Sequence, residues 1–255
     1  MSTLIFNLFI RNLTKYTYKF LKPNTYKHNR RYWPFYRVVR NEKGQIDQVF
    51  FRGALIADHT LALKNTKSKC MLIATGPSIK EIPNHFFQRE ELDYIGVNGA
   101  IALEKVYFTH YVIIDHDFIK NRFDLVERVL DSECIFFTTA RCLDSILRKT
   151  KIQKIRCKFK VIEITSNGKN ELFLEDTNYI DEKTKSHYFY NGFGFSTQIH
   201  DTVFDYHTVA YTALQIIFGL NYQHIYIAGV DMNNFHLPRF YETIDLKQPT
   251  LLDQH

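Results

Sequence analysis

Five short apolar runs constrain the fold of this 255-residue chain more than any other feature of its sequence. The runs are Cys70–Ala74, Tyr94–Val97, Tyr111–Ile114, Cys134–Phe137 and Ile225–Ala228. Continuous apolar runs of this length are typical of strands buried in a parallel sheet, and helix-compatible sequence separates them. The pattern therefore predicts an α/β fold, a Rossmann-like, mostly parallel sheet with helices on both faces.

Polar residues follow the carboxyl ends of these predicted strands. They are Ser78, Asn98, Asp115, Thr138 and Asp231. Open α/β sheets bind ligands at the carboxyl ends of their strands, so we expect these residues to converge on a single cleft.

The turn after the first run reads Thr75-Gly76-Pro77-Ser78. We expect Ser78 to cap a following helix, with Glu81 completing a capping box. A glycine turn at a helix N-terminus suits an anion or a nucleotide. The turn matches neither the dinucleotide fingerprint nor the P-loop, so alone it is a weak signal.

The segment from His207 to Asn234 joins a predicted helix to the last strand. Its first half places apolar residues three and four apart, on one helix face, and Gly219 and Asn221 then favour a break. The run that follows suits a buried parallel strand, and it ends in Gly229-Val230-Asp231. The segment is either half of a nucleotide-binding layer or an ordinary αβ unit.

Positive charge is concentrated in residues 1–69, which carry fourteen lysines and arginines against three acidic residues. The whole chain has a formal net charge of +6, so residues 70–255 are mildly acidic. A nucleic-acid-binding domain would carry its basic residues on the fold itself, so no nucleic-acid partner is expected. We expect two parts, a basic N-terminal segment of residues 1–69 and a globular domain of residues 70–255.

Residues 1–22 show helical spacing of apolar residues with added basic residues. This pattern indicates a helix on an anionic membrane surface, or an ordinary helix docked on the body. Arg30-Arg31-Tyr32-Trp33 is either a contact for lipid headgroups or an anionic glycolipid, or a solvated basic surface. The turn signal Asn41-Glu42-Lys43-Gly44 predicts a hairpin of Tyr36–Arg40 with Gln48–Phe51.

Metal chemistry finds little support in the sequence. The four cysteines form no metal-ligand spacing and indicate a reducing cytosol. Asp115-His116-Asp117 is superficially similar to the DxD motif of metal-dependent glycosyltransferases, but no metal is expected. Hydrolase, kinase and dehydrogenase motifs are absent. Residues 141–190, basic at Lys149–Lys160 and acidic at Glu171–Asp181, fit a solvated excursion or a lid.

The order of several blocks resembles bacterial transferases that use sugars activated by cytidine monophosphate (CMP). The blocks are MLIATGPS (71–78), GVNG (96–99), Ile114-Asp115, HTVAYTALQ (207–215), IAGVD (227–231) and Arg239-Phe240-Tyr241. They are similar to the transferase family that adds Kdo, an octulosonic acid, to the lipopolysaccharide core. They are more distantly similar to lipooligosaccharide sialyltransferases. The resemblance covers residues 70 to 242 and implies a single Rossmann-like domain, a GT-A-like variant with a lid.

The resemblance also implies roles for individual residues. Thr75, Gly76, Pro77 and Ser78 would lie against the nucleotide, and Asn98 and Gly99 would hold the cytidine or the donor sugar. Asp115 would orient a hydroxyl, Thr208 would meet the phosphate or carboxylate of the donor, and Asp231 would shape the cytidine pocket. Tyr241 would hydrogen-bond the departing phosphate.

The general base is the residue that the resemblance leaves open. In the sialyltransferases the base is a histidine that follows the position of Tyr241 in the sequence. This sequence reaches His255, earlier than the family pattern places that histidine. We expect His255 or His207 to substitute, or the domain to be C-terminally incomplete. A CMP-sugar co-substrate, no other cofactor, a lipopolysaccharide or lipooligosaccharide acceptor and a membrane surface are the expected partners. The expected location is the cytoplasmic face of the bacterial inner membrane.

Overall fold

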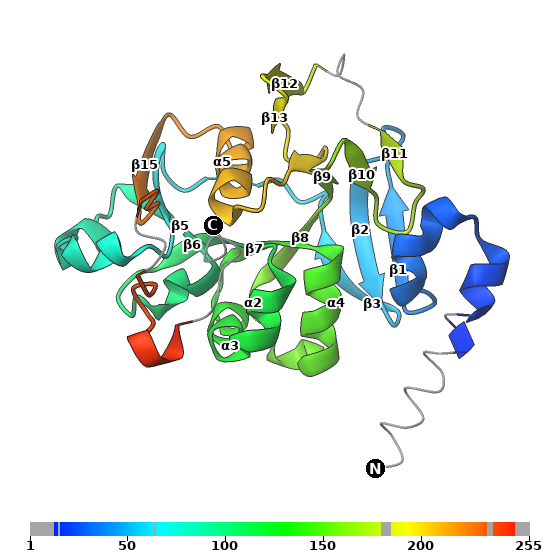
Figure 1. The fold of residues 1–255 in the computed structure, drawn as a ribbon, viewed down its shortest axis with the longest axis horizontal. Coiled ribbons are helices and arrows are strands. Elements are labelled where there is room, and N and C mark those ends of the chain that lie inside the picture. Colours follow the sequence, from blue (N-terminus) through cyan, green and yellow to red (C-terminus); the bar gives the residue numbers. More distant parts are fainter. Residues whose placement is uncertain (1–12, 15, 64, 180–184, 234–236, 248–255) are drawn as a thin grey trace, which may run out of the picture.

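The computed structural model describes residues 13–14, 16–63, 65–179, 185–233 and 237–247. Within these residues the centre is a nine-stranded sheet with the order β1-β2-β3-β8-β7-β6-β5-β4-β15 (Figure 1). The strands from β8 to β15 in that order run parallel to their neighbours. The sheet comprises β1 (Tyr36–Arg40), β2 (Ile46–Phe51), β3 (Ala54–Asp58), β4 (Lys69–Ile73), β5 (Leu92–Val97), β6 (Phe108–Ile113), β7 (Ile135–Thr139), β8 (Lys158–Ile162) and β15 (His224–Ala228).

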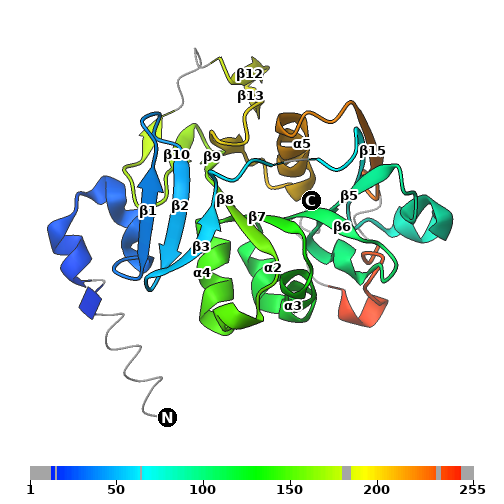
Figure 2. The same ribbon diagram turned by 180° about the vertical axis from the view of Figure 1, so that it is seen from behind.

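Helices cover both faces of this sheet, as predicted. One face carries α2 (His116–Asn121), α3 (Phe123–Asp131) and α4 (Ala140–Lys149), and the other carries α5 (Val209–Gly219) (Figures 1 and 2). Successive strand residues alternate between the two cores, because a strand points neighbouring side chains to opposite faces. Phe136 packs in the core beneath α3 and α4, whereas Phe137 packs in the core beneath α5.

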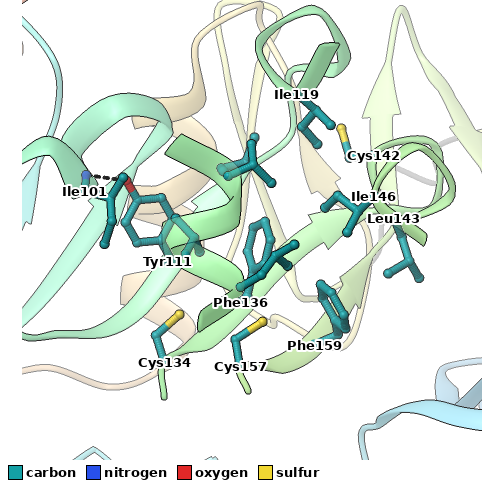
Figure 3. Packing of buried hydrophobic residues seen from close by; sticks show 14 of the residues in the cluster. Ile101, Tyr111, Ile119, Cys134, Phe136, Cys142, Leu143, Ile146, Cys157 and Phe159 are labelled. Atoms are coloured by element: carbon teal, nitrogen blue, oxygen red, sulfur yellow. Dashed lines mark hydrogen bonds between the residues drawn. The ribbon is translucent and has the colours of Figure 1, made fainter. Parts of the chain in front are cut away.

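The larger core lies between the sheet and helices α2 to α4 (Figure 3). Tyr111 is fully buried there, and its hydroxyl accepts a hydrogen bond from the Ile101 backbone NH at 2.8 Å. The same hydroxyl donates to the Asn98 carbonyl at 2.7 Å. Tyr111 thereby connects the core to η4 (Asn98–Ala102), the 3-10 helix that begins at the tip of β5. All four cysteines are free thiols and are buried.

The basic N-terminal segment contributes three strands to the central sheet. The predicted hairpin is present, with β1 and β2 antiparallel. The expected appendage is therefore not separate from the sheet, because β3 pairs in parallel with β8, where Ala57 faces Phe159. The 3-10 helix η1 (Asn24–Arg31) lies beside β1 at this end of the sheet (Figure 2).

Strand β8 occupies part of the stretch that was expected to be a solvated basic excursion. It follows η5 (Ile152–Lys154), and Lys160 within it is only 5% exposed. The Lys160 ammonium donates to the carbonyls of Asp58 and Leu61, at 2.7 and 3.1 Å. These bonds stabilise the buried charge of Lys160, a residue that the sequence pattern places at the surface.

The helix of the His207–Asn234 segment is confirmed as α5, but its strand is not buried. Strand β15 pairs in parallel with β4 and is the edge of the sheet within the described residues. Ile225, Tyr226 and Ile227 are 37%, 47% and 52% exposed. Apolar content predicts a strand but does not distinguish a central position from an edge.

Residues 164–179 and 185–204 contribute smaller sheets beside the main one. They comprise β9 (Ile164–Ser166), β10 (Lys169–Glu171), β11 (Asn178–Tyr179), β12 (His187–Tyr190), β13 (Phe193–Ser196) and β14 (Val203–Phe204). Gln215 of α5 is buried, and its Oε1 accepts from the backbone NH groups of Ser196 and Phe204 at 3.0 and 2.9 Å. A single helix side chain thus fixes β13 and β14 against α5. The remaining short helices are η2 (Pro77–Glu81), η3 (Asn84–Phe87) and η6 (Ile244–Leu246).

Candidate functional site: a cleft at the carboxyl ends of the parallel strands

A large cavity of about 2330 Å³ lies at the carboxyl ends of the parallel strands. Each of these six strands contributes to its wall. The contributions are Gly229–Asp231 after β15, Ala74–Pro77 after β4, Val97–Asn98 from β5, Ile114–Asp115 after β6, Thr139 from β7 and Ile162–Glu163 from β8. Thr138 does not reach the cavity, because its side chain is buried and donates to the Ile113 carbonyl at 2.8 Å.

The turn after β4 is tied to the turn after β15. The Gly76 NH donates to the Gly229 carbonyl at 2.8 Å. Ser78 donates to Asp231 twice, from its backbone NH to Oδ2 at 2.9 Å and from its hydroxyl to Oδ1 at 2.5 Å. A Cβ atom on Gly76 would overlap the Asp231 carboxylate, so only glycine fits there. Thr75, Gly76, Pro77 and Asp231 line the cavity, and Ser78 supports them from behind.

The predicted capping role of Ser78 is wrong. Residues 77–81 form a 3-10 helix whose cap is Gly76, and the side chain that accepts from its first turn is the remote Asp231, which bonds the Ser78 NH. The serine hydroxyl is committed to Asp231 instead. A partner 153 residues away in the chain overrides the local capping-box pattern.

The turn after β5 is held by the aromatic ring of Tyr241. A Cβ atom on Gly99 would overlap this ring, and the Arg122 guanidinium lies 5.1 Å from the ring centroid on its face. The Tyr241 hydroxyl is buried and has no hydrogen-bond partner among the described residues, and burial raises its pKa to about 12. Asn98 lines the cavity with a positive φ of 44°, and its Oδ1 is likewise buried without a partner in the described chain. Gly99 and Tyr241 lie behind the cavity wall and do not line it.

Asp115 lines the cavity and also caps α2. Its Oδ1 accepts from the backbone NH groups of Asp117 and Phe118, at 2.8 and 3.2 Å. Within the part of the chain that the structure describes, no group of three or more His, Cys, Asp or Glu residues is placed to hold a metal ion. Within the Asp115-His116-Asp117 triplet, the Asp115 carboxylate thus serves as the cap of α2.

His116 is a cavity residue to which the sequence pattern gave no role. Its Nδ1 is buried and lies 3.7 Å from Asp117 Oδ1. Burial lowers the pKa of His116, and the neighbouring guanidinium groups of Arg141 and Arg31 lower it further. The ring is therefore neutral at pH 7. Arg31 is remote in sequence, so no local motif marks this histidine.

His207 and Thr208 line the cavity from the start of α5. His207 has a positive φ of 61°, and its backbone NH donates to Asp205 Oδ1 at 2.8 Å. Thr208 is the cap residue of α5, but its side chain makes no capping bond. Both side chains are exposed at the cavity, and His255 lies outside the described residues.

The N-terminal segment closes one end of the cavity through η1. Asn29 is fully buried and fixes η1 to residues 172–175: its amide donates to the Glu175 carbonyl at 2.7 Å, and its Oδ1 accepts from the Leu174 NH at 2.9 Å. The ring nitrogens of His28 are engaged by the Leu172 carbonyl and the Thr177 hydroxyl. No local sequence pattern predicts this wall, because its contacts are long-range.

Comparison with known proteins returned no match to a family model, to a curated protein or to a solved structure. Among the described residues, no helix combines the length and the apolar character needed to cross a bilayer.

Proposed function

We propose that this chain is a glycosyltransferase that moves Kdo, or a related 2-keto sugar acid, from a CMP-activated donor to a lipopolysaccharide or lipooligosaccharide core acceptor. One observation carries the proposal: the ends of all six parallel strands line one cavity, and the Gly76 turn is tied there to Asp231. Ligands of open α/β sheets bind at this edge.

The donor would occupy the part of the cavity between the β4 turn and the start of α5. Gly76 and Pro77 would let the nucleotide approach the backbone, and Asn98 Oδ1 is an unpaired acceptor for an amino or hydroxyl group. The first NH groups of α5, beside Thr208, would meet the single phosphate of CMP, since helix N-termini favour anions. Tyr241 keeps its proton at neutral pH, so its hydroxyl would donate a hydrogen bond to that phosphate. Because the ring lies behind Gly99, this bond would require the Gly99 backbone to move aside.

Transfer would form a bond from an acceptor hydroxyl oxygen to the anomeric carbon of the donor while the bond to the CMP oxygen breaks. A base must take the proton of that hydroxyl. Two histidines are available at the described cavity wall, His207 and His116, since the ring nitrogens of His28 are engaged. A neutral His116 can accept a proton at pH 7, which suits it to this role.

Two further features support the proposal. The small sheets of residues 164–179 and 185–204 lie beside the cavity and would act as a lid. Phe20 and Leu21 are 90% and 70% exposed among basic residues, as expected of a segment on an anionic membrane surface. The protein would then be peripheral on the inner face of the bacterial inner membrane.

Two alternatives remain open to test. A sialyltransferase would prefer CMP-sialic acid over CMP-Kdo in a donor competition. A non-catalytic, membrane-associated scaffold that retains the fold would bind CMP without ever releasing it from a donor.

Calorimetric titration with CMP tests the nucleotide site. We expect wild type to bind, and Thr75→Trp, which fills the cavity between the β4 and β5 turns, to abolish measurable binding. Gln153→Trp is the matched control, because Gln153 is exposed on η5, away from the cavity. Absence of CMP binding by wild type would contradict the proposal, and so would equal affinity for CMP in the Thr75→Trp variant.

A further inference from the structure

We infer that the end of the cavity beside η1 is an anion-binding compartment, formed by Arg31, Arg141 and His116, that takes a phosphate or carboxylate group of the saccharide acceptor. The assignment to an acceptor rests on the proposed function. The anion site itself rests on the following contacts alone.

Three elements bring these cationic and imidazole groups together. Arg31 ends η1, Arg141 lies in the first turn of α4, and His116 begins α2, and all three line the same cavity. Arg31 ion-pairs with Asp144, which lies one turn after Arg141 on α4, so the two guanidinium groups lie at the same end of that helix. Both groups oppose the protonation of the His116 ring. An anion between them would relieve this mutual repulsion.

The carboxylate of Asp144 holds Arg31 in place and is itself too deeply buried to contact a ligand. Asp144 has a fully buried side chain, and its Oδ2 lies 3.0 Å from a terminal nitrogen of Arg31. The same carboxylate accepts from Arg148 Nε at 2.9 Å and from the Tyr36 hydroxyl at 3.3 Å. One negative charge is thus shared by two guanidinium groups, so positive charge is left over at this end of the cavity.

The other charges of the compartment do not cancel this excess. Three more cations line it, from Lys27, Arg30 and Lys169. Opposing them are Glu171, the 81% exposed side chain of Asp117, and Asp115, whose carboxylate caps α2, so the cations still outnumber the carboxylates. The negative charge of Glu163, which also lines the cavity, is already neutralised by Arg40, whose guanidinium lies 2.6 Å from the carboxylate.

The size of the cavity leaves room for a second substrate. Pockets for one small ligand usually measure about 300–1,000 Å³, whereas this cavity measures about 2330 Å³. The strand-end turns and the start of α5 bound one part of the cavity, and η1 and residues 169–177 bound the other part. An acceptor held at η1 would present its hydroxyl toward the donor and lie beside His116.

Titration with a sugar phosphate tests the compartment. The full chain is saturated with CMP, and glucose 6-phosphate or neutral glucose is then titrated in by calorimetry. We expect glucose 6-phosphate to bind without displacing CMP, and glucose not to bind. Arg141→Ala should weaken this binding about tenfold or more, because one charge-assisted hydrogen bond carries an affinity of that order.

Arg128→Ala is the charge-matched control, since Arg128 is exposed on α3 and does not line the cavity. It should leave the affinity unchanged. Equal binding of glucose, displacement of CMP, or an unaltered affinity in Arg141→Ala would overturn the inference.

Two further arms separate the inference from related claims. If CMP does not bind, the proposed nucleotide site fails, and glucose 6-phosphate titrated into the protein alone still decides the anion site. Sedimentation with phosphatidylglycerol vesicles should be the same for wild type and Arg141→Ala. A variant that loses vesicle binding but keeps sugar-phosphate binding would assign these cations to the membrane and overturn the inference.

Discussion

Two glycines at the strand ends are fixed by side chains from the far end of the chain. Gly76 stands against Asp231, and Gly99 stands against the Tyr241 ring. The sequence marked all four as site residues, but their pairing spans more than 140 positions and left no local signal. His116 has no local signal either, because its environment combines burial with the guanidinium groups of Arg141 and Arg31.

The contact of Gly99 with Tyr241 yields a prediction for a double-mutant cycle. Gly99→Ala should lower the free energy of unfolding by about 1–3 kcal/mol, because the added methyl overpacks a filled site. In a Tyr241→Ala background the same change should cost much less, because the ring is gone. Urea denaturation of the four proteins measures the coupling. An equal cost of Gly99→Ala in both backgrounds would show that the ring does not impose the glycine.

At the scale of elements, the parallel strands after residue 69 follow from their apolar runs, whereas β8 and the position of β15 do not. Strand β8 contains lysines, and the Lys160 ammonium is accommodated by the carbonyls of Asp58, at the end of β3, and Leu61, in the loop that follows. Strand β15 is as apolar as a central strand but lies at the edge. Sequence periodicity reports the apolar content of a strand, and the strand order depends on pairings that are long-range.

Two histidines at the central sheet, the part-buried His59 just after β3 and the buried His110 of β6, predict how stability depends on pH. Burial lowers the pKa of His59 to about 3 and that of His110 to about 4. The His59 ring must stay neutral, because its Nε2 accepts from the Val161 NH at 3.0 Å. Above the unfolded pKa of 6.5 neither state binds a proton. Below it only the unfolded chain does, so stability falls by about 1.4 kcal/mol per pH unit for each histidine.

Urea denaturation between pH 7.5 and pH 5 measures this loss. The variant His110→Gln should lose less stability than wild type over the acidic part of the range, because one of the two histidines no longer titrates. A wild-type stability that does not change between pH 7.5 and pH 5 would contradict the neutral state of both rings in the folded protein.

At the scale of the whole molecule, the N-terminal segment and the parallel sheet form one cavity. The sequence separated residues 1–69 from the body by charge alone, and for residues 1–22 it indicated either a helix on a membrane surface or a helix docked on the body. The structure adds β1 to β3 to the central sheet and sets η1 against the cavity. The composition of the segment could not indicate this, because the contacts of Asn29 and Arg31 are made with residues more than 110 positions away.

The central claim is that this cavity transfers a sugar from a CMP donor, and donor turnover tests it most directly. CMP release from CMP-Kdo is followed in a coupled assay with a lipooligosaccharide core acceptor, and the acceptor mass is read at the end point. We predict CMP release, an acceptor heavier by one sugar residue, and loss of both in Thr75→Trp but not in Gln153→Trp. A wild-type protein that binds CMP yet releases none from CMP-Kdo or CMP-sialic acid would contradict the claim and leave a binding scaffold.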